Sequence, residues 1–115
     1  MKQNIIKDKT YQFALHIIQH YQKMQQQNEF VLSNQLLRSG TSVGANVEEA
    51  IAAQSRKDFI SKMSISSKEA RETNYWLRLL RDSKLCANID YTDLIKESEE
   101  IIKILTSIVK TTQKR

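Results

Sequence analysis

The sequence predicts an all-α fold: one domain over residues 1–115, an antiparallel up-down four-helix bundle. Three observations support this prediction. The chain has no proline and only two glycines, so few residues interrupt a helix. Apolar residues recur at spacings of three and four along most of the chain, which is the period of an amphipathic helix. No segment shows the apolar–polar alternation that is typical of a half-buried strand.

The first helix is predicted over about residues 8–26. Its apolar stripe is formed by Ala14, Ile17, Ile18, Tyr21 and Met24. On the face away from this stripe, His16 and His20 lie four residues apart, a spacing that can hold a metal ion. No third ligand stands at a helical offset nearby. We therefore expect a solvent-exposed pair, and the sequence predicts neither a metal site nor a cofactor.

The second helix is expected to begin at Ser33, a residue type that often caps helix N-termini. Inside a helix, glycine costs about 1 kcal/mol relative to alanine. Close approach of a neighbouring helix would offset that cost, so we expect tight packing at both glycines of this helix. They belong to its predicted core face, which consists of Leu36, Leu37, Gly40, Val43, Gly44, Val47, Ala50 and Ile51.

The opposite face of the second helix is composed mostly of small residues. Residues 36–54 contain only three charged side chains, fewer than a solvated helix face normally carries. We therefore expect this face to be covered by another subunit, and Arg38 and Glu49 to find partners on another helix or subunit. The alternative is a plain surface of small residues. The candidate interface residues here are Arg38, Ser42, Ala45, Asn46 and Glu49.

The third helix is predicted over about residues 57–83, after a break near the segment QSRKD. Its core positions follow a heptad-like spacing with small residues in the middle. They are Phe59, Met63, Ser66, Ala70, Thr73, Leu77 and Leu80.

The fourth helix is predicted over about residues 91–113, with Asp90 as its N-cap. Its core positions are Tyr91, Leu94 or Ile95, Ser98, Ile101 or Ile102, Leu105, Ile108 or Val109, and Thr112. The preceding connection contains the single cysteine, Cys86. No catalytic signature surrounds Cys86, so we expect a small, semi-buried filler rather than a nucleophile.

The net charge of +5 is unevenly distributed along the chain. Residues 56–84 carry +4 and residues 106–115 carry +3, whereas residues 85–105 carry −3. Basic surfaces of this kind permit non-specific binding to the phosphates of RNA or DNA; the alternative is charge that only maintains solubility. The candidate phosphate contacts are Lys2, Lys7, Lys9, Arg56, Lys57, Arg78, Arg81, Lys84, Lys110, Lys114 and Arg115.

Several classes of function are disfavoured by the sequence. It contains no phosphate loop, nucleophile elbow or base-reading motif, so an enzyme is not predicted. No apolar run approaches the roughly 18–20 residues of a membrane span, and a cytoplasmic location without membrane contact is expected. A protein-interaction scaffold without nucleic-acid binding remains the alternative function.

Two segments, LSNQLLRSGTSVGANVEEA and SRKDFISKMSISSKEARETNYWLRLLRDS, resemble a bacterial family of four-helix bundles. This family is encoded in intervening sequences of large-subunit ribosomal RNA genes, and some members carry a ribosomal-protein label. The resemblance implies an up-down bundle that assembles into a homo-oligomeric ring, with five subunits expected. The chain is also similar to the accessory protein of diversity-generating retroelements, which implies nucleic-acid binding and a protein partner such as a reverse transcriptase.

A ring requires two different patches on each protomer, and the third helix offers two unlike flanks. Glu69, Glu72 and Trp76 lie on one flank, and Arg71 and Arg78 on the other. Arg71 and Trp76 complete the candidate interface. Trp76 is interpreted either as an interface anchor or as an ordinary core residue, and the sequence does not decide between them.

Overall fold

The computed structural model describes residues 2–115, with the side chain of Lys2 outside the described part. Four α-helices follow one another, α1 (Lys2–Gln26), α2 (Val31–Ile51), α3 (Arg56–Ser83) and α4 (Thr92–Gln113). No strand occurs among residues 2–115, so the all-α prediction of four helices is confirmed. The molecule is a rod of 47 × 20 × 20 Å.

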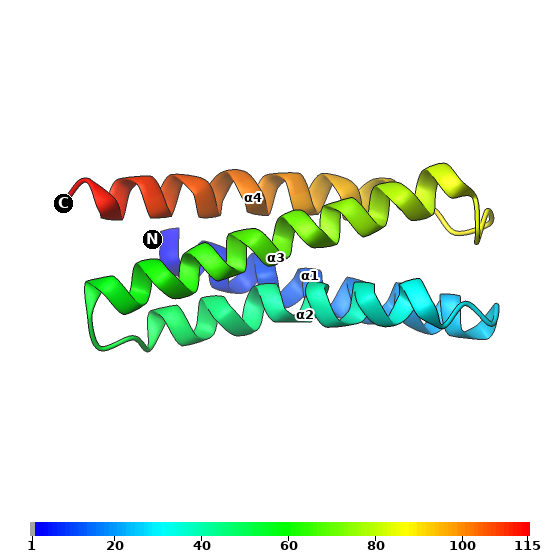
Figure 1. Ribbon diagram of the computed structural model, residues 1–115, viewed down its shortest axis with the longest axis horizontal. Helices are drawn as coiled ribbons and strands as arrows, with labels where there is room; N and C mark the ends of the chain where they lie inside the picture. The colour runs from blue at the N-terminus through cyan, green and yellow to red at the C-terminus, as the bar shows by residue number, and fades with distance from the viewer. Residues whose placement is uncertain (1) are drawn as a thin grey trace.

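Consecutive helices run in opposite directions along this rod (Figure 1). Each helix packs against the next one in the chain, and α4 packs against α1. Both termini and the α2–α3 connection therefore lie at one end of the bundle (Figure 1). The α1–α2 and α3–α4 connections lie at the other end.

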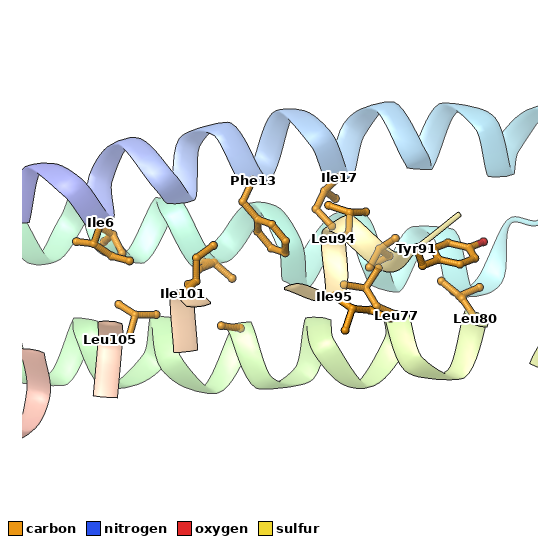
Figure 2. Packing of buried hydrophobic residues seen from close by; sticks show 14 of the residues in the cluster. Ile6, Phe13, Ile17, Leu77, Leu80, Tyr91, Leu94, Ile95, Ile101 and Leu105 are labelled. Carbon is orange, nitrogen blue, oxygen red and sulfur yellow. The ribbon is translucent and has the colours of Figure 1, made fainter. Parts of the chain in front are cut away.

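The core receives apolar side chains from all four helices, and Figure 2 shows how those of α1, α3 and α4 meet between the helices. Phe13, Leu77 and Leu105 are among the side chains with no exposed surface. The predicted core positions of α3 are confirmed: six of them, from Met63 to Leu80, are buried, and Phe59 packs partly buried against the core.

The predicted stripe of α1 was partly wrong. The helix begins at Lys2, and its buried face contains Ile6, Thr10 and Phe13 before Ile17 and Met24. Ile18, by contrast, is 38% exposed. Residues 6, 10, 13 and 17 follow one another by four, three and four. Only Ile6 precedes the predicted start at residue 8, whereas Thr10 and Phe13 lie inside the predicted helix and were left out of the stripe.

The ends of two helices also differ from the prediction. Ser33 is fully buried inside the first turn of α2, and the carboxylate of Glu29 accepts from its backbone N–H at 2.8 Å. Ser33 therefore lies inside the helix rather than capping it, and Glu29 satisfies the backbone N–H of Ser33 in the first turn. Helix α4 begins at Thr92, and Asp90 accepts from the backbone N–H of Thr92 at 2.9 Å.

The tight packing expected at the two glycines is confirmed between α1 and α2. A Cβ atom on Gly40 would lie 2.8–3.0 Å from three side-chain atoms of Ile17. A Cβ atom on Gly44 would lie 3.3 Å from the backbone oxygen of Thr10. The glycines thus lie where α2 packs closely against α1, which accounts for their presence in a helix.

Candidate interaction surfaces

Buried hydroxyl groups join α2 to α3. Ser66 donates a hydrogen bond to the backbone carbonyl of Val43 at 2.7 Å, and the hydroxyls of Thr73 and Ser39 lie 2.9 Å apart. Ser39, Ser66 and Thr73 have no exposed surface. The small residues in the middle of α3 therefore bring the two backbones together and also supply the hydrogen bonds that buried polar groups require.

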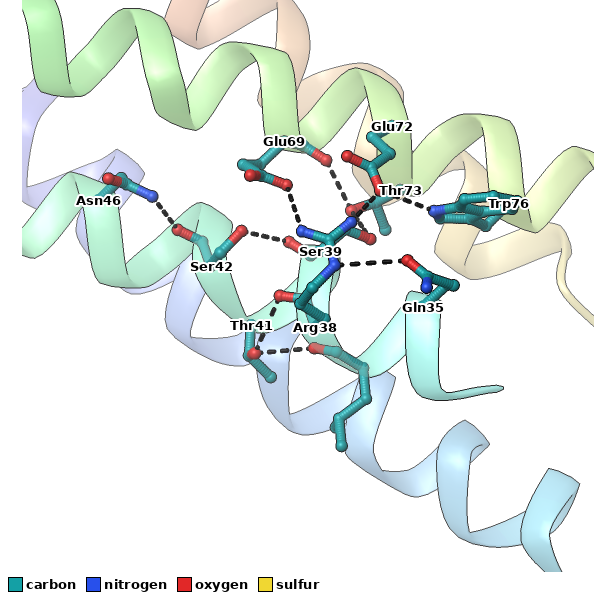
Figure 3. A network of polar contacts seen from close by, with 11 residues as sticks. Gln35, Arg38, Ser39, Thr41, Ser42, Asn46, Glu69, Glu72, Thr73 and Trp76 are labelled. Atoms are coloured by element: carbon teal, nitrogen blue, oxygen red, sulfur yellow. Dashed lines mark hydrogen bonds and ion pairs between the residues drawn. The ribbon is translucent and has the colours of Figure 1, made fainter. Parts of the chain in front are cut away.

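Arg38 on α2 bridges two carboxylates of α3 (Figure 3). Its guanidinium donates to Glu69 at 3.3 Å and to Glu72, and Trp76 Nε1 donates to the same Glu72 carboxylate at 3.0 Å. Lys62 on α3 donates to Glu49 on α2 at 2.8 Å. The expectation that Arg38 and Glu49 have partners on another helix is confirmed, and these partners belong to the same chain.

The other predicted interface residues on α2 divide into two groups. Ser42 and Asn46 are half-buried and bond within the helix, Ser42 to the carbonyl of Ser39 and Asn46 to that of Ser42, each at 2.9 Å. Ala45 is exposed and lines a hollow of about 360 Å³ between α1 and α2, together with Tyr11, Ala14 and Thr41. The α3 side of this face is thus occupied by the chain itself, whereas the α1 side is open.

Next to the open hollow between α1 and α2, the surface of α1 carries further exposed apolar side chains. Tyr11 is 58% exposed, and Leu15 and Ile18 follow it at helical spacing with 39% and 38%. A second exposed set lies on α3, where Ile65, Tyr75 and Leu79 are 38%, 48% and 37% exposed.

On α3, Trp76 is half-buried against the core, and its ring meets that of Tyr75 edge-on at 5.4 Å. The guanidinium of Arg78 lies 5.8 Å from the centroid of the Tyr75 ring. Arg71 is exposed and donates to Thr106 on α4 at 3.2 Å.

The histidine pair of α1 is not a solvent-exposed pair, so that prediction was wrong. Both histidines are half-buried against α4 or the segment before it. His16 Nδ1 lies 2.8 Å from Glu97, and His20 Nε2 lies 3.0 Å from the backbone oxygen of Asp90. The two side chains bridge α1 to the α4 side of the bundle. The part of the chain that the structure describes contains no group of three or more His, Cys, Asp or Glu residues able to hold a metal.

Cys86 is 2% exposed, so it is more deeply buried than the semi-buried filler that was predicted. Burial raises the pKa of the Cys86 thiol, and it also raises the pKa of the neighbouring Tyr91 phenol. A thiol with a raised pKa has little thiolate at neutral pH and is a poor nucleophile.

The basic residues are divided between the two ends of the bundle. We call residues 2–10, 45–64 and 106–115 the basic end; their formal charges are +2, 0 and +3, which gives +5. The opposite end, residues 19–35 and 75–93, has no net charge in either segment. Eight of the predicted phosphate contacts belong to the basic end: Lys2, whose side chain lies outside the described part, and Lys7, Lys9, Arg56, Lys57, Lys110, Lys114 and Arg115.

The remaining predicted contacts, Arg78, Arg81 and Lys84, lie at the opposite end (Figure 1). Several predicted cations already have carboxylate neighbours. Arg81 pairs with Asp82 at 2.7 Å, Lys9 with Glu100 at 2.8 Å, and Lys7 with Glu48 at 4.0 Å. The Lys9 ammonium holds the pKa of the Glu100 carboxyl below its usual range.

A groove between α3 and α4 collects cations that the sequence did not group together. It has a volume of about 540 Å³ and is lined by Arg71, Ile102, Lys103, Thr106, Ser107, Lys110, Thr111 and Lys114. No acidic residue belongs to this lining. We call it the α3–α4 groove. Lys103 was not among the predicted phosphate contacts, and Arg71 was not predicted to lie beside the lysines of α4. The spacing of residues 103, 110 and 114 by seven and four could have shown that these lysines share one face of the helix.

No helix within residues 2–115 combines the length and the hydropathy needed to cross a membrane. The fold and its surfaces define a small helical-bundle protein with polar contacts between α2 and α3 and basic surfaces at one end. Residues 2–107 match the 23S rRNA-intervening sequence protein family, and the chain belongs to this family.

A solved structure provides a second comparison. The chain is similar to a protein of unknown function from the S23 ribosomal protein family of Bacteroides thetaiotaomicron, at 50% sequence identity and a TM-score of 0.90. The match covers 96% of this chain and 99% of that one. No curated protein matches the sequence. Neither match indicates an enzymatic family.

Proposed function

We propose that this protein is a non-enzymatic, homo-oligomeric helical bundle of the bacterial cytoplasm that binds RNA or DNA through basic surfaces. The observation that carries the proposal is the distribution of charge. The formal charge of the basic end equals the net charge of the chain, while the opposite end is neutral. A surface with a net positive charge attracts polyanions. Ribosomal RNA is the first nucleic acid to test, because the family description names it.

The assembly we propose is a ring, with five copies as the expected number. A closed ring needs two unlike patches on each protomer, and the exposed apolar residues form two such sets. One contains Tyr11, Leu15 and Ala45 on α1 and α2, and the other contains Ile65, Tyr75 and Leu79 on α3. Assembly would repeat the basic end around the ring, so that weak phosphate contacts add through avidity.

The decisive experiment is fluorescence anisotropy of labelled 23S rRNA fragments and duplex DNA, titrated with the protein at several salt concentrations. Binding through phosphates weakens steeply as salt rises. Arg56→Glu with Lys57→Glu reverses two charges at the basic end, and Arg78→Glu with Arg81→Glu does so at the opposite end. We expect the variant at the basic end to weaken binding more than the variant at the opposite end, and to do so equally for all RNA and DNA sequences. Absence of binding by the wild type at low salt would refute the nucleic-acid proposal.

The alternative function is a protein-interaction scaffold without a nucleic-acid role. The exposed apolar row of Tyr11, Leu15 and Ile18 on α1 supports it, because adjacent exposed apolar residues are typical of interaction surfaces. A reverse transcriptase is the partner that the family resemblance suggests. Retained binding to such a protein, with no salt-dependent binding to RNA or DNA, would favour this alternative.

A further inference from the structure

We propose that the α3–α4 groove holds the phosphate backbone of a nucleic-acid strand and reads no bases. The inference rests on the proposed nucleic-acid function and assigns it a place and a mode of binding. Its cations are Arg71 on α3 and Lys103, Lys110 and Lys114 on α4.

The first argument is the lack of local counter-charge. Elsewhere on the surface, cations such as Arg38, Lys62 and Arg81 have carboxylate partners within 3.3 Å. None of the four cations in the groove forms an ion pair with a carboxylate of the described residues. Glu100, one turn before Lys103, forms its ion pair with Lys9 on α1, although its charge is also close enough to interact with that of Lys103. Converging like charges that form no ion pair favour an anionic ligand.

The second argument is the chemistry of the remaining lining. Thr106 and Thr111 contribute hydroxyl groups beside the cations, and a neighbouring hollow of about 290 Å³ adds Ser64 and Ser67. The two hollows share Arg71, Thr106 and Lys110, so they form one continuous track. Lysine, arginine and hydroxyl side chains are the groups that contact phosphate and sugar oxygens in nucleic-acid complexes.

The third argument separates a polymer from a single phosphate. At a rise of about 1.5 Å per helical residue, Lys103 and Lys114 are about 16 Å apart along α4. In duplex DNA one strand carries a phosphate about every 3.4 Å along the helix axis, so this length spans several phosphates of one strand. Cations spread over this distance suit a chain of phosphates, whereas one phosphate ion needs donors that converge on a point.

The fourth argument concerns the bases. Neither hollow contains an aromatic residue. Proteins that hold the bases of single strands use aromatic side chains on which the bases stack. The groove can therefore contact the backbone but offers no platform for base stacking, and we expect binding that does not depend on sequence.

The test compares two double variants that remove the same charge. Lys103→Gln with Lys110→Gln removes two cations of the groove, and Lys23→Gln with Lys96→Gln removes two exposed cations outside it that are not candidate phosphate contacts. Binding of a labelled 20-nucleotide single-stranded RNA is measured against salt concentration. Each lost phosphate contact lowers the slope of log K against log salt by about 0.7. We expect a slope reduced by about 1.4 for the groove variant and an unchanged slope for its control.

Each outcome has a distinct meaning. Equal losses in both variants would overturn the groove while leaving nucleic-acid binding intact, and no binding by the wild type would overturn both proposals. A strong preference for one RNA over its complement of equal length would contradict backbone-only contact. Inorganic phosphate that displaces the RNA far better than chloride at matched ionic strength would identify a site for free phosphate, and would also overturn the proposal.

Discussion

Gly40 on α2 lies directly against Ile17 on α1, so close that a Cβ atom on the glycine would fall 2.8 Å from Ile17 Cγ1. Three side-chain atoms of Ile17 surround this position, two of them on its rigid branched carbon. Gly40 and Ile17 thus set the distance between the first two helices. A larger residue at either position must push the helices apart or distort a side chain.

Gly40→Ala is therefore expected to destabilise the fold by about 1–3 kcal/mol, the usual cost of overpacking a core. The gain in helix propensity, up to about 1 kcal/mol, opposes part of this cost. Urea unfolding measures the change. In an Ile17→Ala background the crowding atoms are gone, so Gly40→Ala should become neutral or stabilising there. The same cost in both backgrounds would show that contact with Ile17 is not the reason for the glycine.

Thr73→Val is expected to cost about 1–3 kcal/mol, because it leaves the buried hydroxyl of Ser39 without its partner. Valine keeps the shape of threonine, so packing changes little. In a Ser39→Ala background no hydroxyl is left unpaired, and the cost of Thr73→Val should shrink. Chemical unfolding of the four proteins gives the coupling energy between the two sites. Zero coupling would refute the stabilising role of this hydrogen bond.

Asp90 provides a pH-dependent prediction. The backbone N–H of Thr92 holds the pKa of the Asp90 carboxyl below its usual value. A lowered pKa in the folded state stabilises the protein above the unfolded-state pKa, about 3.9 for aspartate. That contribution is lost as pH falls through the folded-state pKa. Asp90→Ala should therefore lower the urea midpoint at pH 7 and have less effect at pH 2.5. Asp90→Asn retains an acceptor oxygen, so its effect at pH 7 should be smaller than that of alanine.

Ala45→Arg tests the proposed assembly. Ala45 is exposed and lines the hollow between α1 and α2, so arginine there leaves the core unchanged but blocks a partner. We expect sedimentation velocity to show an oligomer for the wild type and a monomer for the variant, with equal helicity by circular dichroism. Gln26→Arg adds the same charge at an exposed position at the end of α1 and should still assemble. An assembled Ala45→Arg protein would exclude this surface from the interface.

Periodicity predicted the interior of the helices well and their ends less well. The core positions of α3 follow a regular spacing, so they could be read from the sequence alone. Ser33 could not, because its role depends on the Glu29 carboxylate that accepts from its N–H. Local propensity identifies residue types that can cap a helix N-terminus. The positions of the side chains in the folded protein decide which of these residues forms the capping hydrogen bond.

The surfaces were harder to predict than the core, because they depend on which helices are neighbours. The low charge of the α2 back face was visible in the sequence, but its coverage by α3 through Arg38 and Lys62 was not. His16 and His20 were expected to face solvent because they lie away from the predicted apolar stripe. Their contacts with Glu97 and Asp90 join residues 81 and 70 positions apart in the chain, which helical periodicity does not show. The grouping of Arg71 with Lys103 likewise appears only once α3 and α4 lie side by side.

The order in which the helices pack has a kinetic consequence. Three of the four helix pairs join neighbours in the chain, and only α1 with α4 joins its two distant parts. Bundles rich in such local contacts fold within microseconds to milliseconds. The α1–α4 pairing closes the longest loop and has the largest entropic cost. We therefore expect the chain to collapse first as helical hairpins, with the His16–Glu97 and Lys9–Glu100 contacts forming late, after the folding transition state.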